Sequence, residues 1–257
     1  MNKRRRAATL LEVLVAIGVF SLMTTVLAAC FSEALTVLRR TSGRDSAARE
    51  LRKARSALQR DLSAGKPDQF TLVDMPDHLG GGGKDGQALC FLSPVDPATG
   101  QCARSPDGLP LWQANILYYL VVPALHDQTF GRHCQGVNGP GGYDDACPHK
   151  MLIRKVIRSS APPPEPLLTN LAPYLTQPNG FDVTAMATEA QVVEVKAVAV
   201  NLLSFRCSFN AQVPHQFEVD ARSVDQQTAS RKYALGSLSL TTQPVTLSLP
   251  FSTFLKN

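Results

Sequence analysis

The sequence predicts an α+β protein in which one long N-terminal helix is followed by a strand-rich region with long loops. Residues 8–30 are almost all apolar, and apolar residues recur at helical spacing as far as residue 62. After Gly65 the pattern changes to short apolar runs separated by turns. A chain of 257 residues with 44% hydrophobic and 18% charged residues is typical of a globular protein with one ordinary core.

A basic segment precedes the apolar run. Its four charges are Lys3, Arg4, Arg5 and Arg6, and without them the formal net charge of the chain falls from +5 to +1. Most of the basicity therefore belongs to a leader of residues 1–7, and we expect no specific nucleic-acid partner. A basic cluster ahead of an apolar segment stays cytoplasmic, which would place the chain after residue 30 on the outer side of the membrane.

The apolar run at residues 8–30 is long enough to span a bilayer as a helix. An ordinary secretory signal peptide has a shorter apolar region and fits poorly with an acidic residue near its start. A lipoprotein signal is a second alternative, because Leu27-Ala28-Ala29-Cys30 has the form of a lipobox. Cys30 would then be lipidated and would anchor a periplasmic binding protein. Neither alternative explains Glu12, since an ionisable residue in a membrane segment costs about 2.5–3.5 kcal/mol.

The segment Ala7-Ala8-Thr9-Leu10-Leu11-Glu12 resembles the signature of the type IV pilin superfamily, a small residue followed by Phe-Thr-Leu, a hydrophobic residue and Glu. The resemblance implies that a prepilin peptidase cuts between Ala7 and Ala8, and that Ala8 becomes the N-methylated first residue. It also implies that Glu12 pairs with the amino terminus of a neighbouring subunit in a filament. A carboxylate in the first turn also suits the positive end of the helix dipole. The chain departs from the signature in having Ala7 where Gly is usual and Ala8 where Phe is usual.

The same resemblance implies a helical spine packed on a mainly antiparallel sheet. The chain would be a minor subunit of a type II secretion pseudopilus or a type IV pilus-like filament. It would span the inner membrane once, with a cytoplasmic N-terminus and a periplasmic globular domain. The implied partners are prepilin peptidase, other pilin or pseudopilin subunits, the inner-membrane assembly platform and membrane lipid. Length and layout resemble those of the larger J-type minor pseudopilins, the W-type minor pilins and the cassette proteins of the Verru_Chthon group.

Beyond the apolar run, we expect the helix to continue through residues 31–64. Its apolar positions form a stripe at helical spacing: Leu35, Leu38, Leu51, Ala54, Leu58 and Leu62. The many arginines between them fit a solvated face, with anionic headgroups or acidic filament neighbours as alternatives. In residues 65–257 the strand candidates are 89–92, 115–122, 152–157, 192–208, 216–219, 233–240 and 245–249. The nearly continuous apolar run at 115–122 is typical of a central strand.

Five cysteines lie outside the apolar run, in a region that the expected topology places in an oxidising compartment. We expect disulfides Cys90–Cys102 and Cys134–Cys147, each of which would close a short loop, and Cys207 as a buried thiol. The sequence alone does not fix this connectivity.

Metal binding is the alternative use of the same region. Candidate zinc ligands are His126, His133, Cys134, Cys147 and His149, and candidate calcium ligands are Asn138, Asp144 and Asp145. Standard zinc sites have paired short spacings, which this region lacks, and the glycines beside the acidic residues indicate turns. We therefore expect no metal and no cofactor. The chain also has no nucleophile elbow, paired His-Glu motif or dinucleotide fingerprint, so we expect no enzyme.

Overall fold

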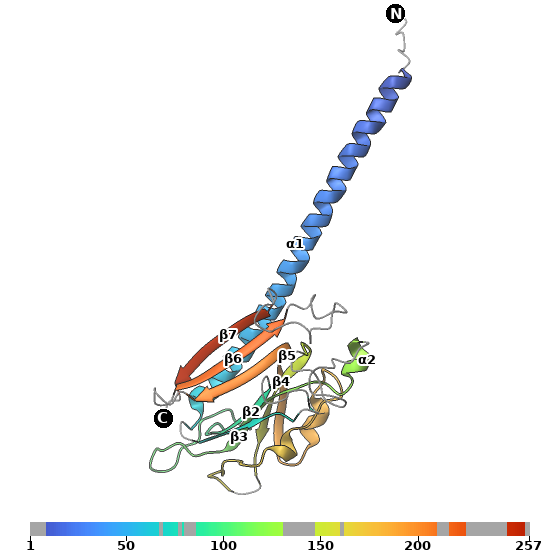
Figure 1. The fold of residues 1–257 in the computed structure, drawn as a ribbon. Helices are drawn as coiled ribbons and strands as arrows, with labels where there is room; N and C mark the ends of the chain where they lie inside the picture. The colour runs from blue at the N-terminus through green and yellow to red at the C-terminus, as the bar shows by residue number, and fades with distance from the viewer. Residues whose placement is uncertain are drawn as a thin grey trace, which may run out of the picture. The chain divides into compact units, whose positions relative to one another are not determined.

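The structure is a computed structural model that describes residues 9–66, 69–76, 79, 86–130, 147–159, 162–209, 216–224 and 246–254. Its longest element is helix α1 (Leu10–Ala64), which continues without a break through Ser42 and Gly43 (Figure 1). The chain divides into two compact units at this point, residues 1–43 and residues 44–257. Helix α1 contributes its first part to one unit and its last part to the other.

The second unit contains a seven-stranded antiparallel sheet whose strands lie in chain order. The strands are β1 (Phe70–Asp74), β2 (Gln87–Ser93), β3 (Ala114–Val121), β4 (Lys150–Ile157), β5 (Val192–Phe209), β6 (Gln216–Val224) and β7 (Thr246–Phe254). The described connections include the short helical elements α2 (His126–Phe130), η2 (Ala172–Tyr174) and η3 (Thr184–Thr188). One long helix and one antiparallel sheet confirm the predicted α+β fold class.

The predicted strands largely match the observed ones. Five of them correspond to β2 through β6, and the candidate at 245–249 overlaps β7. The candidate at 233–240 lies outside the described residues. Strand β1 was not predicted, because its five residues are only partly buried at the sheet edge and carry a weak apolar pattern.

The sheet curls because the two neighbours of the 18-residue strand β5 pair with different parts of it. Its first part, as far as Leu202, pairs with β4, and the part from Leu202 onward pairs with β6. At the changeover Asn201 has a φ of 56°, a left-handed conformation that Asn tolerates better than most residues. Near its end, the Cys207 amide donates a hydrogen bond of 2.8 Å to Gln87 Oε1 in β2, so the strand returns toward the start of the sheet.

Both faces of the sheet are covered, as the alternation in β3 shows. Tyr118 belongs to the core on the helix side, and Tyr119 belongs to the core on the opposite side. The helix-side core includes the buried stripe of α1, which is Leu51, Ala54, Leu58 and Leu62. The opposite core is closed by the segment around η2 and η3, through Leu171, Leu175, Val183 and Met186. All eight residues of β3 are buried, which confirms the prediction of a central strand.

Candidate functional site

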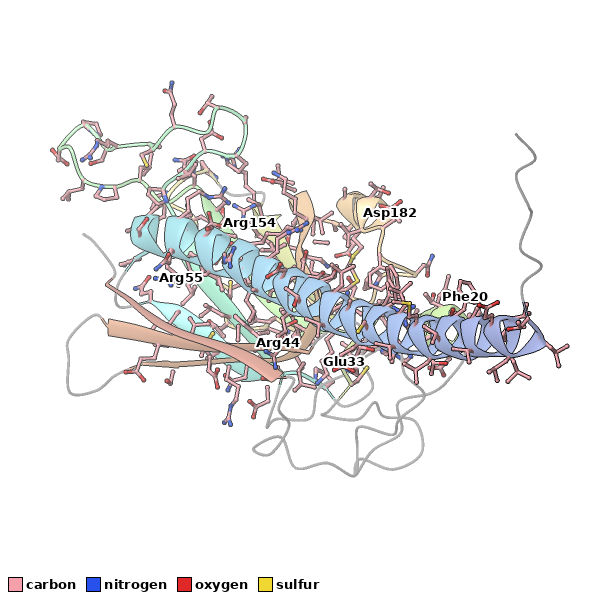
Figure 2. All side chains as sticks on the ribbon, turned by 90° about the horizontal axis from the view of Figure 1, so that it is seen from above. Phe20, Glu33, Arg44, Arg55, Arg154 and Asp182 are labelled. Carbon is pink, nitrogen blue, oxygen red and sulfur yellow. The ribbon has the colours of Figure 1, made fainter. Side chains whose placement is uncertain are left out.

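The first part of α1 is an apolar cylinder. The 23 residues from Leu10 to Ser32 contain one charged residue, Glu12, and they rise about 34 Å at 1.5 Å per residue. A bilayer core is about 30 Å thick. Large apolar side chains here are exposed, including Leu10 at 85% and Phe20 at 72%, and Figure 2 shows Phe20 extending from the helix. Within the described residues, α1 is the one helix long and apolar enough to cross a membrane.

Three of the four hydroxyl groups in this segment donate hydrogen bonds within the helix. Thr24 and Thr25 each donate a 2.8 Å hydrogen bond to the backbone carbonyl four residues earlier, and Ser32 donates to the carbonyl of Ala29 at 2.8 Å. A polar group without a partner costs several kcal/mol in lipid. These internal bonds therefore make the segment compatible with an apolar solvent despite its polar residues.

The start of the helix is closed by a capping box. The Thr9 amide donates to Glu12 Oε2 at 2.8 Å, and the Glu12 amide donates to Thr9 Oγ1 at 3.3 Å. The pair satisfies two of the amides that every helix start leaves without a partner. Glu12 therefore has a local structural role in the isolated chain. The two residues of the expected cleavage junction, Ala7 and Ala8, lie outside the described residues.

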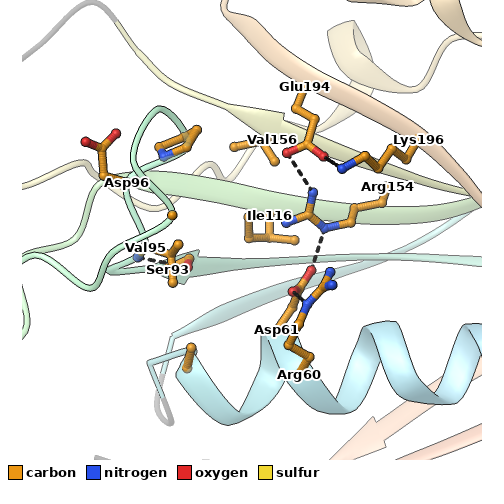
Figure 3. A pocket seen from close by; sticks show the side chains of 13 residues that line it. Arg60, Asp61, Ser93, Val95, Asp96, Ile116, Arg154, Val156, Glu194 and Lys196 are labelled. Atoms are coloured by element: carbon orange, nitrogen blue, oxygen red, sulfur yellow. Dashed lines mark hydrogen bonds and ion pairs between the residues drawn. The ribbon is translucent and has the colours of Figure 1, made fainter.

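A groove lined by both charged and apolar side chains lies between the end of α1 and the sheet of the second unit (Figure 3). Its centre is Asp61, which is only 8% exposed. Asp61 Oδ2 accepts hydrogen bonds from Tyr118 Oη at 2.7 Å and from Arg154 Nε at 2.5 Å, and Asp61 Oδ1 accepts one from Arg60 at 2.9 Å. Arg154 continues to Glu194 at 3.3 Å, and Glu194 pairs with Lys196. Arg154 lies beside the last part of α1 in Figure 2 as well.

The charged groups of this cluster shift one another's pKa values. Burial by itself raises the pKa of Asp61, but the Arg154 guanidinium and the three hydrogen bonds outweigh it and hold the pKa below its usual range. Burial and the neighbouring Asp61 raise the pKa of Tyr118 far above its usual value, so the phenol stays protonated. The Asp61 carboxylate is thus fixed as an acceptor and is not a proton carrier near neutral pH. The cluster is arranged to join α1 to β3 and β4.

A second buried cation joins the opposite face of the sheet to its cover. Lys155 is fully buried and its three ammonium protons have three acceptors: the Tyr174 carbonyl at 2.8 Å, Thr176 Oγ1 at 2.7 Å and Glu189 Oε2 at 2.5 Å. Burial lowers the pKa of Lys155, and the pairing with Glu189 offsets part of this. The fully used donors indicate a structural tie between β4 and the segment around η2 and η3.

The cysteines do not follow the predicted pairing in full. Cys90 is fully buried in β2 and Cys102 is exposed in the loop after it, and both are free thiols, so the expected Cys90–Cys102 disulfide is absent. The reason is that Cys90 points into the core on the face away from α1, where burial raises its pKa to about 12. Cys134 lies outside the described residues. Cys207 is a buried free thiol, as predicted.

The structure brings together three of the five candidate zinc ligands named from the sequence. His126, Cys147 and His149 are buried, and their possible ligand atoms gather within 4.8 Å of one another. Asp127 adds a carboxylate next to His126, with Oδ1 at 2.8 Å from Nδ1. The other histidine and the cysteine named with them, His133 and Cys134, lie outside the described residues, as do Asn138, Asp144 and Asp145.

Asp61, which links α1 to β3 and β4, was not predicted as a buried residue. The sequence does indicate its burial, because Asp61 lies three residues after Leu58 and seven after Ala54, on the face of α1 that is otherwise apolar. An acidic residue at such a position requires a buried partner. The partners, Tyr118 and Arg154, are more than 50 residues away, and their identity was not readable from the sequence.

Comparison of the chain with protein-family models, curated proteins and solved structures finds no match. What the protein does is therefore inferred from its own residues and from their arrangement.

Proposed function

We propose that the protein is a minor pilin or pseudopilin subunit of a type II secretion pseudopilus or type IV pilus-like filament. In this proposal residues 1–7 are removed by prepilin peptidase, the apolar part of α1 holds the subunit in the inner membrane, and residues 65–257 lie in the periplasm. The observation that carries the proposal is Glu12, a carboxylate in the first turn of α1 and the one charged residue in the apolar segment 10–32, which is long enough to span a bilayer.

The energetic cost of Glu12 is the reason why it points to a function. A carboxylate inside a membrane segment costs about 2.5–3.5 kcal/mol even on lenient insertion scales. The capping box with Thr9 contributes only about 0.5–2 kcal/mol, and a neutral Gln at position 12 could accept the same hydrogen bond. The remaining cost is offset if the carboxylate pairs with a cation in the assembled state. In a filament this cation is the amino terminus of a neighbouring subunit.

The globular unit is compatible with such a subunit. The last part of α1 supplies the helix-side core of the sheet, so that one helix provides both a membrane segment and a core element. The outer face of this part is basic, with Arg44, Arg49, Arg52, Arg55 and Arg60 all exposed. An exposed basic face would suit acidic surfaces of neighbouring subunits or anionic headgroups.

Mass spectrometry of the mature N-terminus tests the processing step. The protein is expressed with and without an active prepilin peptidase and recovered from the membrane. We expect a mature chain that starts at N-methylated Ala8 in the presence of the peptidase, and an uncleaved chain in its absence. A mature chain that starts at a lipidated Cys30 would refute the proposal in favour of the lipoprotein alternative. Retention of residues 1–7 with an active peptidase would also count against it.

The assembly role of Glu12 is tested by Glu12→Gln with Glu33→Gln as the matched control. The glutamine oxygen can still accept the Thr9 amide, so the helix cap persists while the negative charge is removed. We expect normal cleavage of E12Q, with at least tenfold less protein in sheared filaments. E33Q removes an exposed charge from the same helix and should assemble like the wild type. Equal assembly of E12Q and E33Q would limit Glu12 to helix capping.

A further inference from the structure

The end of β3 and the start of β4 lie side by side in the sheet. Strand β3 ends at Val121, which is paired with Met151 near the start of β4. Helix α2 follows β3 and presents His126, and Cys147 and His149 directly precede β4. Residues that are more than 20 positions apart in the chain are therefore brought together by strand pairing. A sequence search for short paired spacings does not detect this arrangement.

The three side chains form a compact set of nitrogen and sulfur atoms. His126 Nε2 lies 2.9 Å from His149 Nδ1 and 3.6 Å from Cys147 Sγ, and Cys147 Sγ lies 3.9 Å from His149 Nδ1. Around a tetrahedral zinc ion, with bonds of about 2.0–2.1 Å to nitrogen and 2.3 Å to sulfur, two nitrogen ligands lie about 3.3 Å apart and a nitrogen and a sulfur about 3.6 Å apart. The observed separations are within a few tenths of an ångström of these values.

The residues around the cluster hold the histidine rings and the cysteine in place, as the neighbours of zinc ligands usually do. The Asp127 carboxylate accepts from His126 Nδ1 at 2.8 Å, which fixes the tautomer and leaves the Nε2 lone pair directed at the cluster. Phe130 stacks on the His149 ring with centroids 3.6 Å apart, and Val122 packs with Cys147 in a small apolar cluster. The histidines and the cysteine are buried, so water has little access to the sulfur.

Two anionic groups lie at the site. A Cys147 thiolate, which is buried, and the Asp127 carboxylate, which is 45% exposed, together carry two negative charges, equal to the charge of Zn²⁺. Without metal, His149 Nδ1–H can donate to His126 Nε2 across the 2.9 Å separation. For metal to bind, His149 moves its proton from Nδ1 to Nε2 and stays a neutral imidazole, while the Cys147 thiol proton is released to solvent. The two nitrogens then separate to about 3.3 Å.

We propose that His126, Cys147 and His149 form a zinc site that fastens the two ends of the 131–146 connection. These three ligands come from the described part of the chain and fill three of the four positions of a tetrahedral zinc ion. The ion would take the place of the Cys134–Cys147 disulfide that the sequence suggested, because a thiolate bound to zinc is not available for that bond. This proposal does not depend on the pilin assignment, since a metal clip suits any exported domain.

The experiment uses the full-length protein in detergent, isolated from cells grown with zinc. We expect one zinc per chain by elemental analysis, and we expect cobalt substitution to give a thiolate-to-cobalt charge-transfer band. Absence of this band in the wild-type protein would overturn the proposal without reference to any variant. A Cys134–Cys147 disulfide in the isolated protein, found by peptide mapping without reduction, would also overturn it.

Variants assign the ligands. Cys147→Ser and His126→Gln should each weaken zinc binding at least 100-fold, and Asp127→Asn should weaken it about tenfold through the lost second-shell charge. Cys90→Ala is the matched control, because Cys90 is also a buried free thiol but lies in β2, and it should bind zinc like the wild type. Unfolding of each variant in excess chelator shows whether its metal-free fold is intact. Wild-type zinc affinity in a folded Cys147→Ser protein would contradict the assignment.

Discussion

The two parts of helix α1 have the same backbone structure and opposite surroundings. In residues 10–38 the large apolar side chains are exposed, with Leu27 at 60% and Leu38 at 66%. In residues 44–64 the apolar side chains form a stripe that is buried in the core, with Ala54 and Leu58 fully covered. The exposed part is apolar on all sides. In the part that packs on the sheet, buried apolar residues on one face alternate along the chain with exposed arginines on the other face. A helix apolar on all sides requires an apolar solvent, and a striped helix requires only a sheet on one side.

The largest expected effect concerns the buried stripe. Leu58→Ala should lower the free energy of unfolding of the second unit by about 3–4 kcal/mol, because the change removes apolar contacts and leaves a cavity. Urea unfolding in detergent, followed by the fluorescence of Trp112, measures this. Trp112 is the single tryptophan and lies 5.8 Å from Lys66 Nζ near the end of α1.

Leu27→Ala is the control on the exposed part of the same helix. It should change the free energy of unfolding by less than about 0.5 kcal/mol, as is usual for exposed positions. Similar losses of unfolding free energy for Leu58→Ala and Leu27→Ala would show that Leu58 is not more deeply packed than Leu27.

The next effect concerns the exposed part and is a loss of membrane insertion. Val19→Lys places a charge near the middle of the apolar segment and should cost about 2.5–3.5 kcal/mol of insertion free energy. The measurement is the fraction of protein that resists alkaline extraction from membranes, which should fall. Leu109→Lys, on an exposed loop of the second unit, should leave this fraction unchanged. If both variants stay in the membrane equally, the apolar segment is not the anchor.

The smallest effect concerns Asp61, the charged residue within the buried stripe. Asp61→Asn should lower the free energy of unfolding by about 2 kcal/mol at neutral pH, because Arg154 loses its buried counter-ion. The pKa of Asp61 in the folded protein lies below its usual value of 3.8. The stabilisation by the ionised carboxylate is therefore fully present above pH 3.8. It is lost as the pH falls below 3.8 and through the lower pKa of the folded state.

A pH series of urea unfolding separates this charge effect from packing. The difference between wild-type and D61N stability should shrink as the pH is lowered through 4, since protonation makes the wild-type side chain neutral as well. A difference that stays constant to low pH would indicate that shape and not charge accounts for the loss.

The sequence predicted the elements that depend on local pattern and missed the features that depend on distant pairs. The extent of α1 and the central strand β3 follow from apolar periodicity and apolar run length. The free thiol of Cys90 was not predicted, because its burial depends on strand packing. The grouping of His126 with His149 depends on the pairing of β3 with β4, and spacing rules that consider neighbours along the chain do not include it.

The strand order of the sheet gives the domain a direction of assembly. Among the described residues, each strand from β2 to β7 pairs with the preceding described strand, and α1 is made before all of them. Because α1 precedes the strands in the sequence, the helix on which they pack is made first, and strands can be added one at a time without waiting for a distant partner. Among the described strands, the edge that receives the next strand advances with each addition from β1 to β7. Synthesis and sheet formation would proceed in the same order.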